Sequence, residues 1–207
     1  MQPFHILLIG NAAPVSARLL STLARQADKV LASDGGAGKA LAAGIVPDWV
    51  IGDLDSVSKR DLKRLQNRVI HVVSQENTDL EKTLHFIKRK PVTHLTLVGF
   101  LGGRWDFSIA NILHLIPYAK KMNVSLAGDG WRMNLITHSA RFVTRLHKRV
   151  SLVPLSKCSG VTLAGLKYPL QQETLPVGTT RSLSNQTAAR EFSVQLSRGV
   201  LLVYREV

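Results

Sequence analysis

Residues 47–56 read Pro-Asp-Trp-Val-Ile-Gly-Asp-Leu-Asp-Ser. The apolar run 49–51 predicts a short buried strand that breaks at Gly52. Asp53 and Asp55 follow at alternate positions, and on an extended backbone such residues point to the same side. Two carboxylates aimed at one point repel each other unless a cation or a shared proton lies between them. The stretch therefore predicts either a Mg²⁺ site, because this ion takes one or two carboxylates together with substrate phosphates, or a polar turn that caps the next helix.

A second acidic cluster lies at a predicted helix start, in residues 75–82, which read Gln-Glu-Asn-Thr-Asp-Leu-Glu-Lys. Thr78 and Glu81 have the spacing of a capping box, and the helix dipole alone would favour Asp79 in the first turn. The strand predicted over residues 69–73 nevertheless brings this helix start to the edge of the sheet where Asp53 and Asp55 lie. Ligands of open α/β sheets bind outside the carboxyl ends of the strands. We therefore expect Asp53, Asp55 and Asp79 to hold Mg²⁺ on substrate phosphates.

Two glycine-rich loops follow other predicted strands. They read Asp34-Gly35-Gly36-Ala37-Gly38 and Gly102-Gly103-Arg104-Trp105-Asp106. Glycines let the backbone approach a phosphate closely, and the guanidinium of Arg104 suits phosphate geometry. Each loop alone could be an ordinary turn, but together with the acidic clusters the loops predict one site for phosphates and a metal. Asp34 and Asp106 are further candidates there, as ligands or as groups that orient ligands.

The N-terminal half of the chain alternates predicted strands and helices. This pattern indicates an α/β domain with a mostly parallel sheet and flanking helices, which we assign to residues 1–132. Pro117 should kink or end the last of the helices. The strands are expected near Phe4, Val30, Val50, Val69, Leu95 and Val124, and the helices over residues 16–28, 36–43, 58–67, 78–90 and 105–122.

The C-terminal half, residues 133–207, shows short apolar runs and no helical periodicity. It predicts a small antiparallel β-sandwich domain. Residues 176–185 are polar and are expected to form a loop, and Ser197-Arg198-Gly199 are expected to form a hairpin turn between the last two strands. The strands are expected over residues 142–146, 150–155, 160–166, 191–196 and 200–204.

Composition restricts the class of protein. Lys and Arg number 27 against 14 Asp and Glu, for a net charge of +13. The densest basic patches, 88–90 and 145–149, have no interleaved aromatic residues, so a basic surface around an anionic substrate is favoured over nucleic-acid binding. One cysteine, Cys158, excludes an internal disulfide, and with no secretory signal this favours the cytoplasm. No apolar run is long enough to span a membrane, so no membrane partner is expected.

The motifs resemble, in family order, those of the thiamine pyrophosphokinases. The resemblance covers nearly the whole chain and continues through residues 151–155, the Gly165-Leu166-Lys167-Tyr168 stretch, Ser184-Asn185 and residues 199–203. The sequence departs from the family pattern at several positions. Phe107 stands where His is usual, Gln186 where Glu is usual, Gly38 where Asn is common, and Leu54 where Phe is frequent.

The resemblance implies an enzyme that transfers diphosphate from its co-substrate ATP to thiamine, with Mg²⁺, and that acts as a homodimer. It implies that Ser184 and Asn185 contact thiamine, with the second half of the chain helping to build that site across the subunit interface. Asp53, Asp55, Asp79 and Arg104 would be catalytic. ATP would be bound by Asp34, Gly35, Gly36, Lys82, Gly102, Gly103, Arg104 and Asp106.

Two alternatives stay open on the residues themselves. A different pyrophosphokinase, acting for instance on a hydroxymethyl pterin, would keep the acidic clusters but would lack the Gly-Leu-Lys-Tyr and Ser-Asn stretches. A non-catalytic nucleotide-binding or nucleic-acid-binding module would keep the fold without the reaction.

Overall fold

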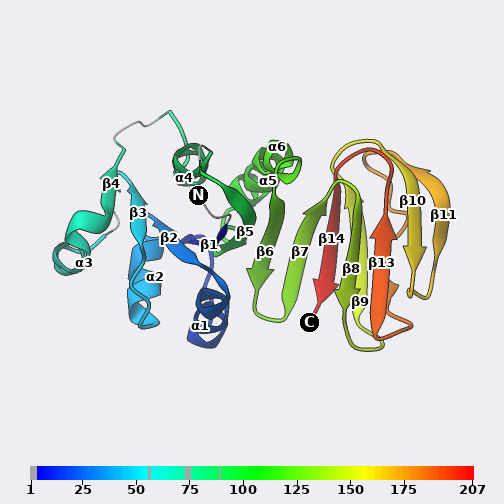
Figure 1. The fold of residues 1–207 in the computed structure, drawn as a ribbon, viewed down its shortest axis with the longest axis horizontal. Helices are drawn as coiled ribbons and strands as arrows, with labels where there is room; N and C mark the ends of the chain where they lie inside the picture. Colours follow the sequence, from blue (N-terminus) through cyan, green and yellow to red (C-terminus); the bar gives the residue numbers. More distant parts are fainter. Residues whose placement is uncertain (1–3, 56, 73–75, 89) are drawn as a thin grey trace. The chain divides into compact units, whose positions relative to one another are not determined.

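The structure is a computed structural model that describes residues 4–55, 57–72, 76–88 and 90–207 (Figure 1). Its contacts divide the chain into two units, Met1–His114 with Leu126–Asp129, and Leu115–Ser125 with Gly130–Val207. Across the described ranges, no helix combines the length and the apolar character needed to cross a membrane.

The first unit contains the parallel sheet that the alternating pattern predicts. Its strands lie in the order β4-β3-β2-β1-β5, and every neighbouring pair in this order is parallel. The inner strands β1, β2 and β3 are mostly runs of buried residues because both faces of the sheet are covered, whereas β4 at the edge contains no buried residue. The strands are β1 (Phe4–Ile9), β2 (Lys29–Ser33), β3 (Trp49–Gly52), β4 (Val69–His71) and β5 (Val92–Val98).

The side chains of β2 alternate between the two faces of the parallel sheet, and their contacts show which helices cover each face. Val30 and Ala32 of β2 pack in clusters with side chains of α1 (Ala17–Gln26), α2 (Gly36–Ala42) and α3 (Lys59–Leu65). Leu31 points to the opposite face because successive side chains of a strand alternate. On that side α4 (Asp79–Ile87) packs against β2 and β3 with its buried apolar residues.

Side-chain caps define where these helices begin. The hydroxyl of Ser16 accepts a hydrogen bond from Leu19 N at 3.2 Å, and the hydroxyl of Thr78 accepts one from Glu81 N at 3.2 Å. The helix starts predicted at these residues are therefore confirmed. The helix predicted over residues 105–122 is two helices, α5 (Trp105–His114) of the first unit and α6 (Ile116–Ala119) of the second, and Pro117 lies in the first turn of α6.

The second unit is a sandwich of two antiparallel sheets, in the orders β12-β9-β14-β7 and β11-β10-β13-β8. Alternate side chains of both sheets, including Leu152, Val203, Leu163 and Phe192, form one buried cluster. The predicted fold class is thus confirmed in both halves. The later strands are β6 (Asn123–Gly128), β7 (Trp131–Ile136), β8 (Ser139–Val143), β9 (Arg149–Pro154), β10 (Cys158–Ala164), β11 (Leu170–Leu175), β12 (Asn185–Gln186), β13 (Glu191–Gln195) and β14 (Leu201–Glu206).

Several expectations for strands are wrong in detail. Ser197-Arg198-Gly199 do not join a hairpin, because β13 pairs with β8 and β10 whereas β14 pairs with β7 and β9 in the other sheet. The segment crosses from one sheet to the other, which a local turn signal does not distinguish from a hairpin. Strands β7, β11 and β12 were not predicted, and β11 reads Leu-Gln-Gln-Glu-Thr-Leu, without an apolar alternation. Strand β4 ends at His71, and Val73 of the predicted strand lies outside the described residues.

Candidate active site

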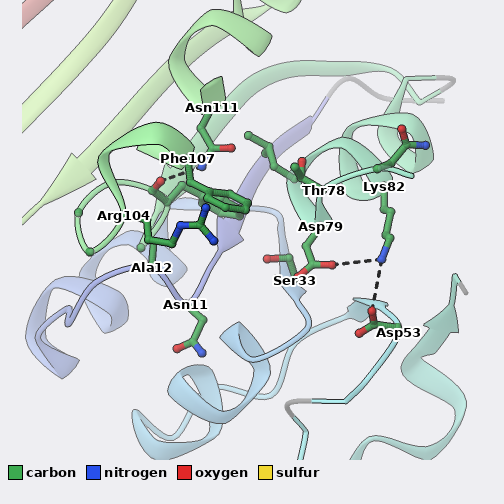
Figure 2. A pocket seen from close by; sticks show the side chains of 16 residues that line it. Asn11, Ala12, Ser33, Asp53, Thr78, Asp79, Lys82, Arg104, Phe107 and Asn111 are labelled. Atoms are coloured by element: carbon green, nitrogen blue, oxygen red, sulfur yellow. Dashed lines mark hydrogen bonds and ion pairs between the residues drawn. The ribbon is translucent and has the colours of Figure 1, made fainter. Parts of the chain in front are cut away.

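A cavity of the first unit lies where the strand order reverses. From β1 the chain continues to β2, β3 and β4 on one side, but β5 returns to the other side of β1. The loops that leave β1 and β5 therefore diverge, which opens a crevice at the carboxyl ends of the strands. The cavity there has a volume of about 580 Å³ (Figure 2). It is lined by Asn11, Ala12, Ser33, Asp53, Asn77, Thr78, Asp79, Leu80, Lys82, Gly99, Phe100, Gly102, Gly103, Arg104, Phe107 and Asn111.

A buried lysine joins the two acidic clusters on one wall. Lys82 Nζ lies 3.6 Å from Asp53 Oδ2 and 3.4 Å from Asp79 Oδ1, and its side chain is 4% exposed. Asp53 follows β3, while Asp79 and Lys82 are one turn apart at the start of α4. Figure 2 shows both ion pairs meeting at the lysine ammonium. The predicted convergence of Asp53 and Asp79 is therefore observed, with a lysine between the carboxylates.

A third carboxylate, Asp34, lies close to this pair. It is buried, and its Oδ1 has no hydrogen-bond partner among the described residues. Burial raises the pKa of Asp79; Lys82 lowers it, and the charges of Asp34 and Asp53 raise it further. Gly52 makes room for Asp34, because a Cβ at residue 52 would come within 2.9 Å of the Asp34 Cβ.

These carboxylates have the chemistry of a hard-cation site. An unpartnered buried oxygen on Asp34 and a raised pKa on Asp79 are both relieved by a cation. Within the described ranges, however, no three His, Cys, Asp or Glu side chains are grouped closely enough to hold a metal ion by themselves. Asp55 is exposed and does not line the cavity, so the structure does not bring it to Asp53 and Asp79.

The second glycine loop, with Gly102 and Gly103, and Arg104 form the wall that faces Asp53 and Asp79 across the cavity (Figure 2). Ser108 of α5 holds this loop, since its hydroxyl accepts a hydrogen bond from Gly102 N at 3.0 Å and lies 3.0 Å from Arg104 O. The guanidinium of Arg104 lies 4.3 Å from the centre of the Phe107 ring. Phe107, the residue that replaces the usual His, thus supports the arginine by stacking instead of offering a hydrogen bond.

Arg104 also pairs with Asp106, which does not itself line the cavity. Arg104 Nε donates to Asp106 Oδ1 at 3.2 Å, and Nη2 donates to Oδ2 at 2.5 Å. This hydrogen bonding raises the pKa of Arg104 and lowers the pKa of Asp106. Both side chains are exposed, so the pair sets the orientation of the guanidinium more than the stability of the fold.

The first glycine loop has a packing role. A Cβ at Gly36 would lie 2.1 Å from Ile9 O, so only glycine lets α2 begin against the end of β1. Neither Gly35 nor Gly36 lines the cavity, although Ser33 just before them does. Sequence reasoning missed Asn11 and Ala12, which follow β1. The signal for these two residues is their position just beyond the carboxyl end of β1, because ligands of open α/β sheets bind outside the strand ends.

The second unit has its own cavity, of about 310 Å³, around the two residues predicted to contact thiamine. Ser184 and Asn185 both line it, together with Lys167 and Tyr168. Asn185 is buried, and its amide donates to Tyr168 O at 2.7 Å and accepts from Tyr168 N at 3.1 Å and from Gln186 N at 2.8 Å. The Asn185 side chain therefore holds the Tyr168 loop, whereas Ser184 is exposed.

Loss of the Asn185 amide should destabilise the chain. We expect Asn185→Ala to lower the free energy of unfolding by about 1–3 kcal/mol, because the backbone N–H and C=O of Tyr168 lose their partner. Denaturant unfolding measures this difference. Ser184→Ala is the matched control and should change stability by less than about 0.5 kcal/mol. Equal stability of the two variants would contradict the positioning role of Asn185.

Comparisons with known proteins match both halves of the chain to one family. Residues 20–126 match the family described as "Thiamin pyrophosphokinase, catalytic domain", and residues 136–201 match "Thiamin pyrophosphokinase, vitamin B1 binding domain". Thiamine pyrophosphokinase of Bacillus subtilis is 26% identical over 173 residues, which cover 80% of this chain and 81% of that protein.

Solved structures show the same fold. The crystal structure of the Bacillus subtilis thiamine pyrophosphokinase has a TM-score of 0.83 at 22% identity, covering 98% of this chain and 99% of the other. The thiamin pyrophosphokinase of Candida albicans has a TM-score of 0.82 at 18% identity, covering 99% and 90%. The catalytic-domain match alone spans more than half of the 207 residues, and the chain belongs to the thiamin pyrophosphokinase family.

Proposed function

We propose that the chain transfers a diphosphate group from ATP to the hydroxyl group of thiamine, giving thiamine diphosphate and AMP. Besides the family, one observation carries this proposal. Lys82 lies buried between Asp53 and Asp79 and faces Arg104 across the cavity at the strand switch point. This arrangement concentrates opposite charges where a polyphosphate would lie, and phosphate transfer depends mainly on positioning and charge neutralisation.

The cationic groups would bind and orient the phosphates. Arg104 offers a planar fork for phosphate oxygens, held in place by Asp106 and Phe107. Lys82 would neutralise phosphate charge on the side of the cavity where Asp53 and Asp79 lie. Because Gly102 N already donates to Ser108, the contribution of this loop is its close backbone approach, together with Gly103, more than a free Gly102 N–H.

Asp53 and Asp79, with Asp34 beside them, would hold Mg²⁺ together with the phosphate oxygens of ATP, since these three described carboxylates are not grouped closely enough to hold a metal ion alone. When bound, the ion would supply the charge neutralisation that developing phosphate charge requires. The fit rests on this pair of carboxylates and on the buried, unpartnered oxygen of Asp34 beside them. Asp55 stays a predicted ligand, at an exposed position outside the cavity lining.

The identity of the products tests the reaction directly. We expect the chain, incubated with ATP, Mg²⁺ and thiamine, to give AMP and thiamine diphosphate in equal amounts, because the β,γ-diphosphate moves as one unit. Phosphorus NMR distinguishes these products from ADP and thiamine monophosphate, which would indicate a simple kinase. A hydroxymethyl pterin in place of thiamine is the control substrate, and turnover of the pterin alone would contradict the proposed acceptor.

We further propose a cytoplasmic homodimer in which the second unit of one subunit completes the thiamine site of the other. Large apolar side chains are exposed on this unit, among them Val143, Tyr168 and Val177, as expected of an interacting surface. The cavity around Tyr168 and Ser184 would receive the neutral-to-cationic heterocycle by shape and a few hydrogen bonds.

Mixed dimers should reveal shared sites. An inactive Asp53→Asn subunit mixed with an inactive subunit altered at Tyr168 and Ser184 should recover activity, because one site of each mixed dimer is intact. Random exchange makes about half of the dimers mixed, and one of the two sites in each mixed dimer is intact. The mixture should therefore show about a quarter of the activity of the same amount of wild-type protein. Asp53→Asn mixed with itself is the control. Verified exchange of subunits without recovery, or a fully active monomer in sedimentation, would contradict a shared site.

A further inference from the structure

The second unit carries most of the positive charge of the chain, although the phosphate cavity described above lies in the first. Residues 115–125 and 130–207 contain thirteen Lys and Arg against three Glu, so they hold ten of the thirteen net positive charges. All three glutamates are already paired with arginines, in the pairs Glu173–Arg181, Glu191–Arg141 and Glu206–Arg149. No acidic residue of this unit is left outside these three pairs.

Three of these cations converge on one cavity of about 530 Å³, which we call the basic cavity. Lys120 comes from the end of α6, Lys157 from the loop between β9 and β10, and Arg198 from the segment that crosses between the two sheets. No acidic side chain lines this cavity, and none of the three cations forms an ion pair within the described residues. Gathering like charges costs free energy unless an anion lies between them.

The rest of the lining can donate hydrogen bonds to such an anion. Ser156 Oγ accepts a hydrogen bond from Val200 N at 2.9 Å, which leaves the hydroxyl hydrogen free to point into the cavity. Ser159 also lines the cavity. Gly199 is required by the crossing segment, since its φ is +112° and a Cβ there would lie 2.6 Å from Lys157 O. The two segments that carry Lys157 and Arg198 are thus locked together.

We propose that the basic cavity binds the diphosphate group of a phosphorylated small molecule, at a second site separate from the catalytic one. Three separated cations and the hydroxyl of Ser156 match several phosphate oxygens better than a single carboxylate. The lining contains no aromatic ring on which a base or heterocycle could stack, so recognition rests on the phosphates. Inorganic pyrophosphate, ATP and thiamine diphosphate share this group. The proposal does not depend on the reaction proposed above.

Amide NMR of the whole chain, titrated with inorganic pyrophosphate, tests the site. We expect shifts at residues 156–159 and 198–200 that saturate separately from any shifts near Gly103 or Thr78. In the double variant Lys157→Gln with Arg198→Gln, affinity at these amides should fall by about tenfold or more, because charge-assisted hydrogen bonds are lost. The control Lys121→Gln with Arg190→Gln removes the same charge from exposed positions outside the cavity and should keep the affinity within about twofold.

Further titrations distinguish which molecule supplies the diphosphate group and whether another kind of ligand binds instead. Repeating the titration with ATP and with thiamine diphosphate shows which carrier of the group binds most tightly. Shifts only near the catalytic cavity, equal loss in the control variant, or binding of a single-stranded oligonucleotide but not of pyrophosphate would each overturn the proposal. Turnover of the double variant should match that of the wild type, so failure of the proposed reaction and failure of this site are distinguishable.

Discussion

Asp79→Asn and Asp53→Asn should each lower turnover by about 100-fold or more while the chain remains folded. Both carboxylates meet at Lys82 on the acidic wall of the cavity, and loss of a focused charge contact in the transition state costs a few kcal/mol. Steady-state kinetics with saturating ATP and thiamine measures the loss, and circular dichroism verifies the fold.

Asp61→Asn is the matched control for these two variants. It removes a carboxylate from the surface of the same unit, where Asp61 hydrogen-bonds to Ser58, and should leave turnover within about threefold. Asp55→Asn addresses the metal prediction, because the structure places Asp55 outside the cavity lining. Near-normal Mg²⁺-dependent turnover in both Asp53→Asn and Asp79→Asn would refute the assignment of the site.

Lys82→Met should reduce both turnover and stability. Without the lysine, Asp53 and Asp79 repel each other with no cation between them, and the pKa of Asp79, already raised by burial, should rise further. A raised carboxyl pKa means that the folded state binds more protons than the unfolded state. The stability of the metal-free variant should therefore fall as pH rises from the ordinary value of about 4 through the raised pKa.

Denaturant unfolding at several pH values measures this effect. At neutral pH we expect a loss of about 1–3 kcal/mol, moderated because the side chains of Asp53 and Asp79 are 23% and 40% exposed. Added Mg²⁺ should restore part of the lost stability if the carboxylates bind the ion. Lys63→Met, at an exposed position of α3, serves as the control. A pH-independent loss equal to that of the control would contradict a charge-bridging lysine.

Local sequence signals succeeded where the physical cause was local. The helix starts at Ser16 and Thr78 follow from hydroxyl groups that cap backbone N–H groups within three residues. The break near Pro117 follows from its missing N–H. Signals failed where pairing partners are distant, as at Ser197–Gly199, since a turn residue does not specify which sheet the next strand joins.

The candidate site likewise has features that local sequence patterns predict and features that depend on contacts between distant residues. Carboxylates that follow the strand at residues 49–52 and begin the helix at Asp79 can be predicted from the residues alone, because strand alternation and capping are short-range. Three features of the sites follow from the folded chain instead: Lys82 lies between Asp53 and Asp79, Asp55 does not line the cavity, and Asn185 holds the Tyr168 loop. These outcomes depend on which segments the sheets bring together, and contacts between residues far apart in the chain are set by burial and packing of the whole unit, which no short motif encodes.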